Sequence, residues 1–160
     1  MKIKACLIGA ICIGLNASAW AFGEVNHWSS GWGQGTTEYV VKGKGQSQLY
    51  IGCNPDKAMF VMFTDAVGRS LTNYDAQAQM RSFYVAVDGR APILFNDVLS
   101  RVGADSVHFA WDKLRKGNMV VVSGEGMQTT RFTLKDAGQI LPTFSQSDCK
   151  IGAAIPTGEN

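Results

Sequence analysis

The positions of the cysteines constrain this chain more than any other feature. Cys6 and Cys12 lie in an apolar stretch at the start of the sequence, whereas Cys53 and Cys149 lie in its body. In an oxidising compartment, two remaining cysteines pair by default. A bridge between them closes a loop of about 97 residues, for which chain entropy gives a stabilisation of about 4 to 5 kcal/mol. We therefore expect a disulfide that joins the C-terminal segment to an early strand.

A catalytic thiol or a metal-binding pair is the alternative for Cys53 and Cys149. The sequence contains only two histidines, and neither lies near a cysteine along the chain. Thiolates in catalytic and zinc sites commonly have histidine or further cysteine neighbours. The structural disulfide is therefore the preferred interpretation.

The first 21 residues predict a secretory signal peptide. Two lysines precede an unbroken apolar stretch at residues 5–15, and small residues follow it. The stretch is shorter than the roughly 20 residues that span a bilayer, and no later segment approaches that length. Cleavage fits best after Ala21 and second best after Ala19. We expect an exported protein, periplasmic or secreted, without a membrane anchor.

The charge balance gives no reason to expect a nucleic-acid partner. The whole chain has 15 basic and 13 acidic side chains and a net charge of +2. Removal of the signal peptide takes away Lys2 and Lys4 and no acid, so the mature charge is zero. A basic surface is the usual electrostatic signature of nucleic-acid binding. We predict no such partner.

Hydrophobic patterns predict a single α+β domain over residues 22–150, with an antiparallel sheet or sandwich of about six or seven strands. The predicted strands are 36–42, 48–53, 58–64, 83–87, 91–95, 119–122 and 127–134. Residues 58–64 are apolar on both faces, which indicates a central strand. Pro92 cannot donate to a ladder, so its strand should lie at an edge. Residues 65–82 are predicted to be a loop with at most one helical turn.

Two helices are expected. The first covers residues 105–117, with Asp105 or Ser106 as N-cap and Gly117 as the stop. The second has apolar residues at helical spacing between positions 134 and 144, but Pro142 should kink or break it. The tail, residues 151–160, shows no pattern and is predicted to be flexible.

The order of elements from Val107 onward resembles a known group of bacterial proteins. A helix ending in Leu-Arg-Lys-Gly, a valine strand and a glycine turn precede RFTLKDAGQILPTFSQSDC. This is similar to the C-terminal half of periplasmic proteins of the invasion-associated locus B kind, and to type VI secretion accessory proteins. Phe132, Leu134, Ala137 and Cys149 match, whereas Pro142 departs. The resemblance covers about a third of the chain and implies an exported, virulence-associated β-rich domain with a docked helix; it supplies no catalytic residue.

The two histidines are the first candidates for chemistry. His108 lies four residues before Asp112 on the predicted helix, where an acid–base pair or a solvated ion pair could form. His27 lies in a stretch of aromatic residues and glycines that shows neither strand nor helix period. No nucleophile, metal set or cofactor loop accompanies either of them. We predict no catalytic residue, no metal and no cofactor.

The aromatic residues near the start of the mature chain are the predicted binding residues. Trp28 and Trp32 lie beside flexible glycines, and Tyr39 follows in the first predicted strand. Such rings either pack under the sheet or form a contact surface. Exposed aromatic residues contribute strongly to binding energy. We assign these three residues to a binding patch, with core packing as the alternative.

Three functions follow from these observations, in decreasing order of preference. The first is a non-enzymatic interaction module that binds a protein partner in the periplasm or outside the cell. The second is a periplasmic immunity or inhibitor protein against a toxin or a lytic enzyme, for which residues 68–80 offer the one long loop that could enter an active site. The third is a hydrolase, which would need a cleft that collects His108 or His27 with acids.

The predicted signal peptide can be tested directly. N-terminal sequencing of the exported protein should give Phe22 as the first residue, or Trp20 as the second choice, because small residues occupy the positions before both sites. An exported, folded protein that retains Met1 would contradict this prediction. In that case Cys6 and Cys12 would also need a structural role.

Overall fold

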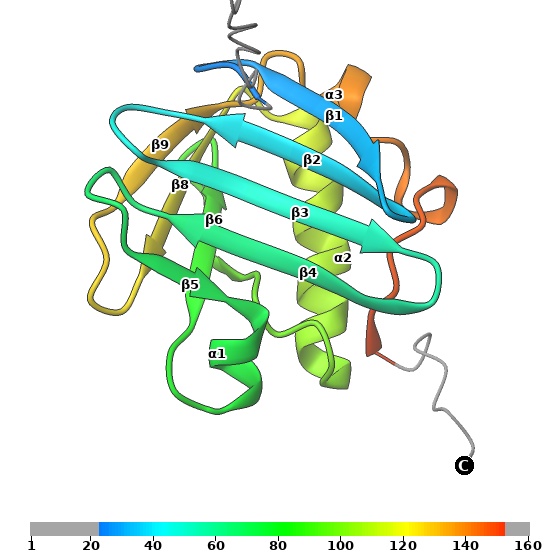
Figure 1. Cartoon of the computed structure of the whole chain (residues 1–160). Helices are drawn as coiled ribbons and strands as arrows, with labels where there is room; N and C mark the ends of the chain where they lie inside the picture. Colours follow the sequence, from blue (N-terminus) through cyan, green and yellow to red (C-terminus); the bar gives the residue numbers. More distant parts are fainter. Residues whose placement is uncertain (1–22, 153–160) are drawn as a thin grey trace, which may run out of the picture.

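Two antiparallel sheets and one long helix make up the fold in the computed structural model, which describes residues 23–152 (Figure 1). The predicted signal peptide, Cys6, Cys12 and most of the predicted tail lie outside these residues. The larger sheet has the order β1-β2-β3-β4-β5, and the smaller one has the order β7-β6-β8-β9. The single α+β domain with a mainly antiparallel sheet architecture is confirmed. No helix in the described part of the chain is long and apolar enough to cross a membrane.

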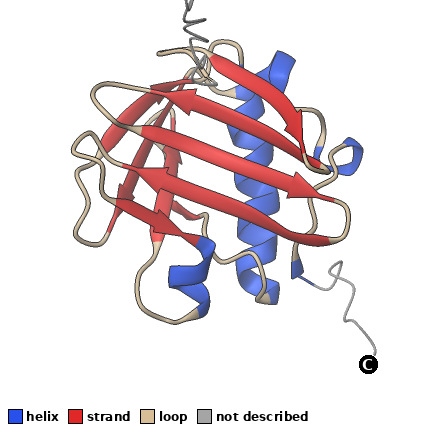
Figure 2. Cartoon of the chain, in the orientation of Figure 1, coloured by secondary structure: helices blue, strands red, loops and turns tan. Residues whose placement is uncertain are grey.

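The strands of the larger sheet are consecutive in sequence. They are β1 (Trp28–Gly33), β2 (Thr36–Lys42), β3 (Gln48–Asn54), β4 (Lys57–Thr64) and β5 (Ser70–Thr72). The smaller sheet contains β6 (Phe83–Val87), β7 (Ile93–Leu94), β8 (Met119–Gly124) and β9 (Thr130–Thr133). The helices are α1 (Asn73–Gln77), α2 (Arg101–Lys116) and α3 (Ala137–Ile140), followed by the 3-10 turn η1 (Phe144–Gln146). Figure 2 shows that strands are the main secondary structure of the fold.

The core lies between the inner face of the larger sheet, the smaller sheet and α2. Figure 1 shows α2 running behind the strands of the larger sheet. The rings of Tyr39 on β2 and Trp111 on α2 meet edge to face with centroids 5.7 Å apart. Phe63 on β4 contacts Phe83 at 5.9 Å and Phe132 at 6.4 Å in the smaller sheet. Aromatic contacts therefore join all three layers.

Two strand predictions were wrong. Residues 28–33 were expected to lack strand structure because glycines and serines interrupt any apolar alternation, yet they form β1 by pairing with β2. Strand β4 is not central, because only β5 lies beyond it in the sheet. Its inner residues are buried, whereas Phe60 and Met62 on its outer face are partly exposed. In addition, residues 23–152 contain nine strands, where six or seven were predicted.

Helix α2 begins four residues earlier than predicted. Ser100 is the N-cap, and its hydroxyl accepts a hydrogen bond from the Gly103 amide at 3.0 Å. Gly103 looks like a helix breaker in the sequence, but here it makes room for Asp97, which a Cβ would meet at 2.3 Å. Gly117 ends the helix as predicted. The expected break at Pro142 is also present, since α3 ends at Ile140.

The Cys53–Cys149 disulfide is present and joins β3 to the C-terminal segment across a separation of 96 residues. Both cysteines are buried, at 0 % and 5 % exposure. Beyond the disulfide, the Lys150 carbonyl accepts a hydrogen bond from Met59 at 2.8 Å, and the Gly152 amide donates to Val98 at 2.8 Å. Residues 151 and 152 of the predicted flexible tail are therefore held against the domain.

Asp65 is a fully buried carboxylate in the turn between β4 and β5. It accepts hydrogen bonds from the amides of Val67, Arg69 and Gln128 and from the Arg69 side chain, at 2.8 to 3.1 Å. Burial alone raises the pKa of Asp65, but the hydrogen bonds from Gln128, Arg69 and Val67 outweigh it and lower the pKa to about 2. The carboxylate therefore ties the β4–β5 turn to the β8–β9 connection.

Loss of the disulfide should destabilise the fold without changing its topology. The variant Cys149→Ser is expected to lower the free energy of unfolding by about 2 to 5 kcal/mol, because the unfolded chain gains freedom. Chemical denaturation with and without reductant measures this loss. Intact-mass analysis of the exported protein should show one bridge; two alkylatable thiols before reduction would contradict the pairing.

Asp65 should make stability depend on pH in a defined window. Because its folded pKa of about 2 lies below its ordinary value of 3.8, the stabilisation is complete above about pH 5 and is lost as pH falls through the folded pKa of about 2. The variant Asp65→Asn should be less stable at neutral pH and should lack the pH-dependent stabilisation that the Asp65 carboxylate provides. Thermal midpoints at pH 7, 4 and 2.5 measure the effect, with the exposed turn residue in Asp56→Asn as control. Equal pH profiles for the wild type and Asp65→Asn would contradict the assignment.

Candidate functional site

The structure separates the three aromatic residues that the sequence grouped into a binding patch. Trp28 and Tyr39 are 3 % and 4 % exposed and belong to the core. The Trp28 indole donates a hydrogen bond to the Thr133 carbonyl at 2.9 Å, which satisfies its polar atom. The assignment of these two residues to a contact surface is corrected, because neither can reach a partner in this fold. Trp32 alone is exposed, at 75 %.

Trp32 lies near the end of β1, which is an edge strand of the larger sheet (Figure 1). It is opposite Thr37, which in turn is opposite Cys53, so Trp32 is on the inner face of the sheet but beyond the core. Within residues 23–152, the side of β1 that faces away from β2 has no strand or hydrogen-bond partner. Helix α3 contacts β1, and His27 just before β1 pairs with Asp136 just before α3. Among the described residues, the site is therefore a strand edge without a hydrogen-bonded neighbour strand, with α3 beside its start and one large exposed ring near its end.

The other sheet edges are shorter or carry protective residues. Strand β5 has three residues and β7 has two, directly after Pro92. Strand β9 has four residues, with Arg131 exposed on it. Natural sheets block their edges with short strands, prolines and charges. Strand β1 has six residues, WSSGWG, without proline or charge. Among the strands of residues 23–152, it is the longest edge strand, and its sequence contains none of these protective residues.

A second surface feature lies on the outer face of the larger sheet and was missed by sequence reasoning. We call it the aromatic groove: Tyr50, Phe60 and Tyr74 form it together with Glu38, Gly52 and Lys57. Two hollows, of about 430 and 570 Å³, adjoin over Phe60 and Gly52. The three rings come from β3, β4 and α1, and only strand register could have shown that they share a face.

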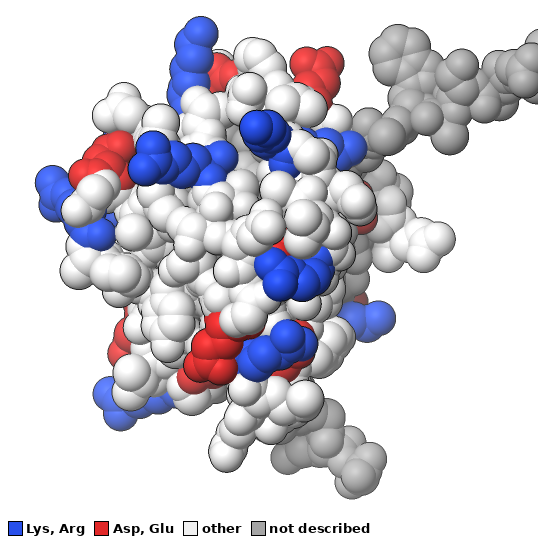
Figure 3. Space-filling view, turned by 90° about the vertical axis from the view of Figure 1, so that its left-hand side faces the viewer, with Lys and Arg blue, Asp and Glu red and all other residues white. Residues whose placement is uncertain are grey.

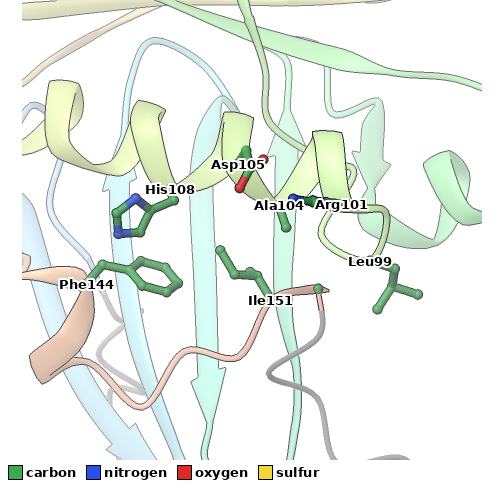
Figure 4. Close-up of a pocket in the computed structure, with 8 residues that line it drawn as sticks. Leu99, Arg101, Ala104, Asp105, His108, Phe144 and Ile151 are labelled. Atoms are coloured by element: carbon green, nitrogen blue, oxygen red, sulfur yellow. The ribbon is translucent and has the colours of Figure 1, made fainter.

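A further hollow, of about 720 Å³, lies between α2 and the C-terminal segment (Figure 4). Arg101, Asp105 and His108 line it from the helix, and Ile151 lines it from the segment that follows the disulfide. The His108 ring packs edge to face on Phe144, with centroids 5.1 Å apart. Histidine and an acid thus share a cleft, but none of the described side chains that line it carries a hydroxyl or a thiol.

His27 lies in a different place from His108. Its Nδ1 atom is 2.8 Å from an oxygen of Asp136, and this exposed pair joins the start of β1 to the start of α3. The two histidines therefore do not form one site. Among residues 23–152, no group of three or more histidines, cysteines and acids could hold a metal ion. On the face in Figure 3, basic and acidic side chains are interspersed.

Comparison with known proteins gives one match. No curated protein and no solved structure is similar to the chain. The comparisons do not bear on the resemblance to invasion-associated locus B and type VI secretion accessory proteins, which stays a prediction. The family model described as YfjT matches residues 26–141, from the residue before His27 to the residue after α3. Because this match covers well over half of the sequence, the chain belongs to the YfjT family.

Proposed function

We propose that this protein is a non-enzymatic interaction module that binds a protein partner in the periplasm or outside the cell. The observation that carries the proposal is the open edge of β1. A partner segment in extended conformation adds to such an edge through main-chain hydrogen bonds, and side-chain pockets supply the specificity. Trp32 is the anchor at this edge, since its ring is 75 % exposed.

The position of Trp32 supports this role. Large aromatic residues supply contact area at low entropic cost, and tryptophan is enriched among residues that dominate binding energy. Asp148 lies close by, because its carboxylate accepts a hydrogen bond from Thr37, the residue opposite Trp32. A partner strand along β1 would therefore meet main-chain groups, an indole ring and one carboxylate. This combination suits a peptide better than a small molecule.

The hydrolase alternative rests on the cleft beside α2, where His108 and Asp105 lie together. Acid–base catalysis requires a base within hydrogen-bond reach of the reacting group and a nucleophile or an activated water. The cleft supplies a candidate base, the imidazole of His108. We keep this alternative because it has a direct test in His108.

The inhibitor alternative rests on residues 68–80. They contain β5 and α1 rather than an irregular loop, and Thr72 and Asp75 form a capping box at the helix start. Tyr74 and Met80 are 64 % and 65 % exposed. An ordered segment with exposed apolar side chains would also suit contact with a protein, so this alternative differs from the main proposal in the contacting surface.

Substitution of Trp32 should weaken partner binding without lowering stability. Trp32→Ala is expected to reduce affinity by about 1 to 3 kcal/mol, because an exposed anchor is lost. Ser30→Lys should weaken binding as well, since it places a charge on the edge strand. The partner is first identified by co-purification from envelope and culture fractions, and dissociation constants are then measured with the purified pair.

Two controls make this experiment decisive. Val102→Ala removes another highly exposed apolar side chain, on α2, and should leave affinity unchanged. Trp28→Ala should instead lower the free energy of unfolding, by about 3 to 5 kcal/mol, because a buried ring is removed. Unchanged affinity in both edge variants would refute the proposal. A hydrolytic activity that His108→Ala abolishes while the fold stays intact would replace it with the enzyme alternative.

A further inference from the structure

We propose that the aromatic groove on the outer face of the larger sheet binds a neutral oligosaccharide. This surface lies on the opposite face of the sheet from Trp32, because Tyr50 is next to Ile51 on β3 and Ile51 is buried on the inner side. The inference goes beyond protein binding at β1, and either proposal can fail alone.

The three rings of the groove are neighbours whose planes are inclined to one another, by 65° between Tyr50 and Phe60 and by 44° between Phe60 and Tyr74. Tyr50 and Phe60 lie with ring centroids 5.9 Å apart, and Phe60 and Tyr74 lie 5.8 Å apart. Tyr74 is 64 % exposed, and the other two rings are partly exposed. Sugar rings have an apolar face of C–H groups that packs on aromatic rings. A row of three rings offers contact for more than one sugar unit.

The Tyr50 ring is held in a fixed position. Its hydroxyl donates a 2.7 Å hydrogen bond to the Glu38 carboxylate on the neighbouring strand. Gly52 lies two residues after Tyr50 on β3 and opposite Glu38 on β2. A Cβ at this position would come 3.2 Å from the ring atom Cε1 of Tyr50. Burial and the bond to Glu38 raise the pKa of Tyr50, so that the phenol stays protonated and the bond persists. Glycine thus allows the ring to lie close over the sheet.

The polar side chains around the rings suit hydroxyl groups. Lys57, Asn54 and Gln77 supply N–H donors, and Glu38 and Thr36 supply oxygen acceptors. One base and one acid line the hollows, so the groove selects neither anions nor cations. A sugar hydroxyl both donates and accepts, and can pair with either kind of group. A neutral polyhydroxyl ligand therefore fits this lining.

An extended peptide fits the groove less well. Strands β2, β3 and β4 are paired on both sides, so their main-chain groups are already hydrogen bonded within the sheet. A peptide strand on this face would find no main-chain partners for its own polar groups, which costs free energy. A proline-rich peptide is the exception, because its backbone needs none and aromatic grooves bind it. That peptide is included as an arm of the test.

The shape of the groove suits a chain rather than a single sugar. The two hollows, of about 430 and 570 Å³, share Thr36, Gly52, Lys57 and Phe60, so they form one elongated depression. Sites for small molecules cover about 300 to 1,000 Å³. Each hollow can therefore take one or two sugar units, with Phe60 between them.

The experiment measures binding of soluble tetrasaccharides to the exported protein. Isothermal titration calorimetry with cellotetraose, chitotetraose and maltotetraose is expected to detect saturable binding to at least one of them. Tyr74→Ala should weaken that binding about ten-fold or more, and Tyr50→Phe by a smaller factor, because the ring remains but its fixing bond is lost. Tyr84→Ala, which removes a partly exposed ring from the smaller sheet, should stay within about two-fold of wild type.

Every outcome decides for or against the inference. Binding that Tyr74→Ala weakens and Tyr84→Ala does not, with unchanged thermal midpoints, supports it. Absence of binding to all three tetrasaccharides, or binding that is insensitive to Tyr74→Ala, overturns it. Binding of a proline decapeptide that depends on Tyr74, in place of the sugars, overturns it in favour of a peptide ligand. Trp32→Ala should leave sugar binding unchanged, which separates this test from that of the β1 edge.

Discussion

The structure depends on the packing of Trp111 between the larger sheet and the C-terminal segment. Its side chain is fully buried, and its ring meets Tyr39 on one side and Phe144 on another, at 5.7 and 5.5 Å. The indole N–H donates to the Pro142 carbonyl at 2.9 Å. One side chain of α2 thus joins the sheet and the segment that leads to Cys149. The disulfide then fixes the end of that segment to β3.

This packing covers one part of the larger sheet and leaves the end of β1 and the aromatic groove exposed. Helix α2 and the smaller sheet cover the inner face along β2, β3 and β4, whereas β1 extends beyond the core. The end of β1 therefore presents Trp32, although it lies on the inner face. On the outer face, α1 lines one end of the aromatic groove through Tyr74, and the three rings are exposed or partly exposed. Regular elements hold both candidate surfaces, strand β1 for Trp32 and β3, β4 and α1 for the groove, which favours binding by a preformed site.

Sequence patterns predicted the parts of the fold that follow from local chemistry. The pairing of Cys53 with Cys149 was predicted because only two cysteines lie outside the predicted signal peptide and cysteines pair in an oxidising compartment. The break before Pro142 was predicted because proline has no backbone N–H to donate within a helix. Strand β1 could not be predicted, because WSSGWG has no apolar alternation and is a strand only through its pairing with β2. The start of α2 was missed because Gly103 packs against Asp97, a contact that no local pattern reveals.

The candidate surfaces were harder to predict than the fold. Trp28 and Trp32 are alike in sequence, yet one is buried and the other exposed, because only the first reaches the core. Asp65 lies in a turn between two strands, and nothing in its local sequence indicates that it is fully buried within hydrogen bonds. The rings of the aromatic groove come from three elements, and strand register brings them together. Burial and register depend on tertiary structure, which short patterns do not contain.

Hydrogen exchange along β1 tests the central claim most directly, because it reports the state of each main-chain amide. In the free protein, the amides of residues 28–33 that face away from β2 should exchange fast, while those of β3 stay protected. With the purified partner bound, the same β1 amides should become protected. Amides of β1 that are as protected as those of β3 in the free protein, or that do not change on binding, would contradict a strand-accepting edge.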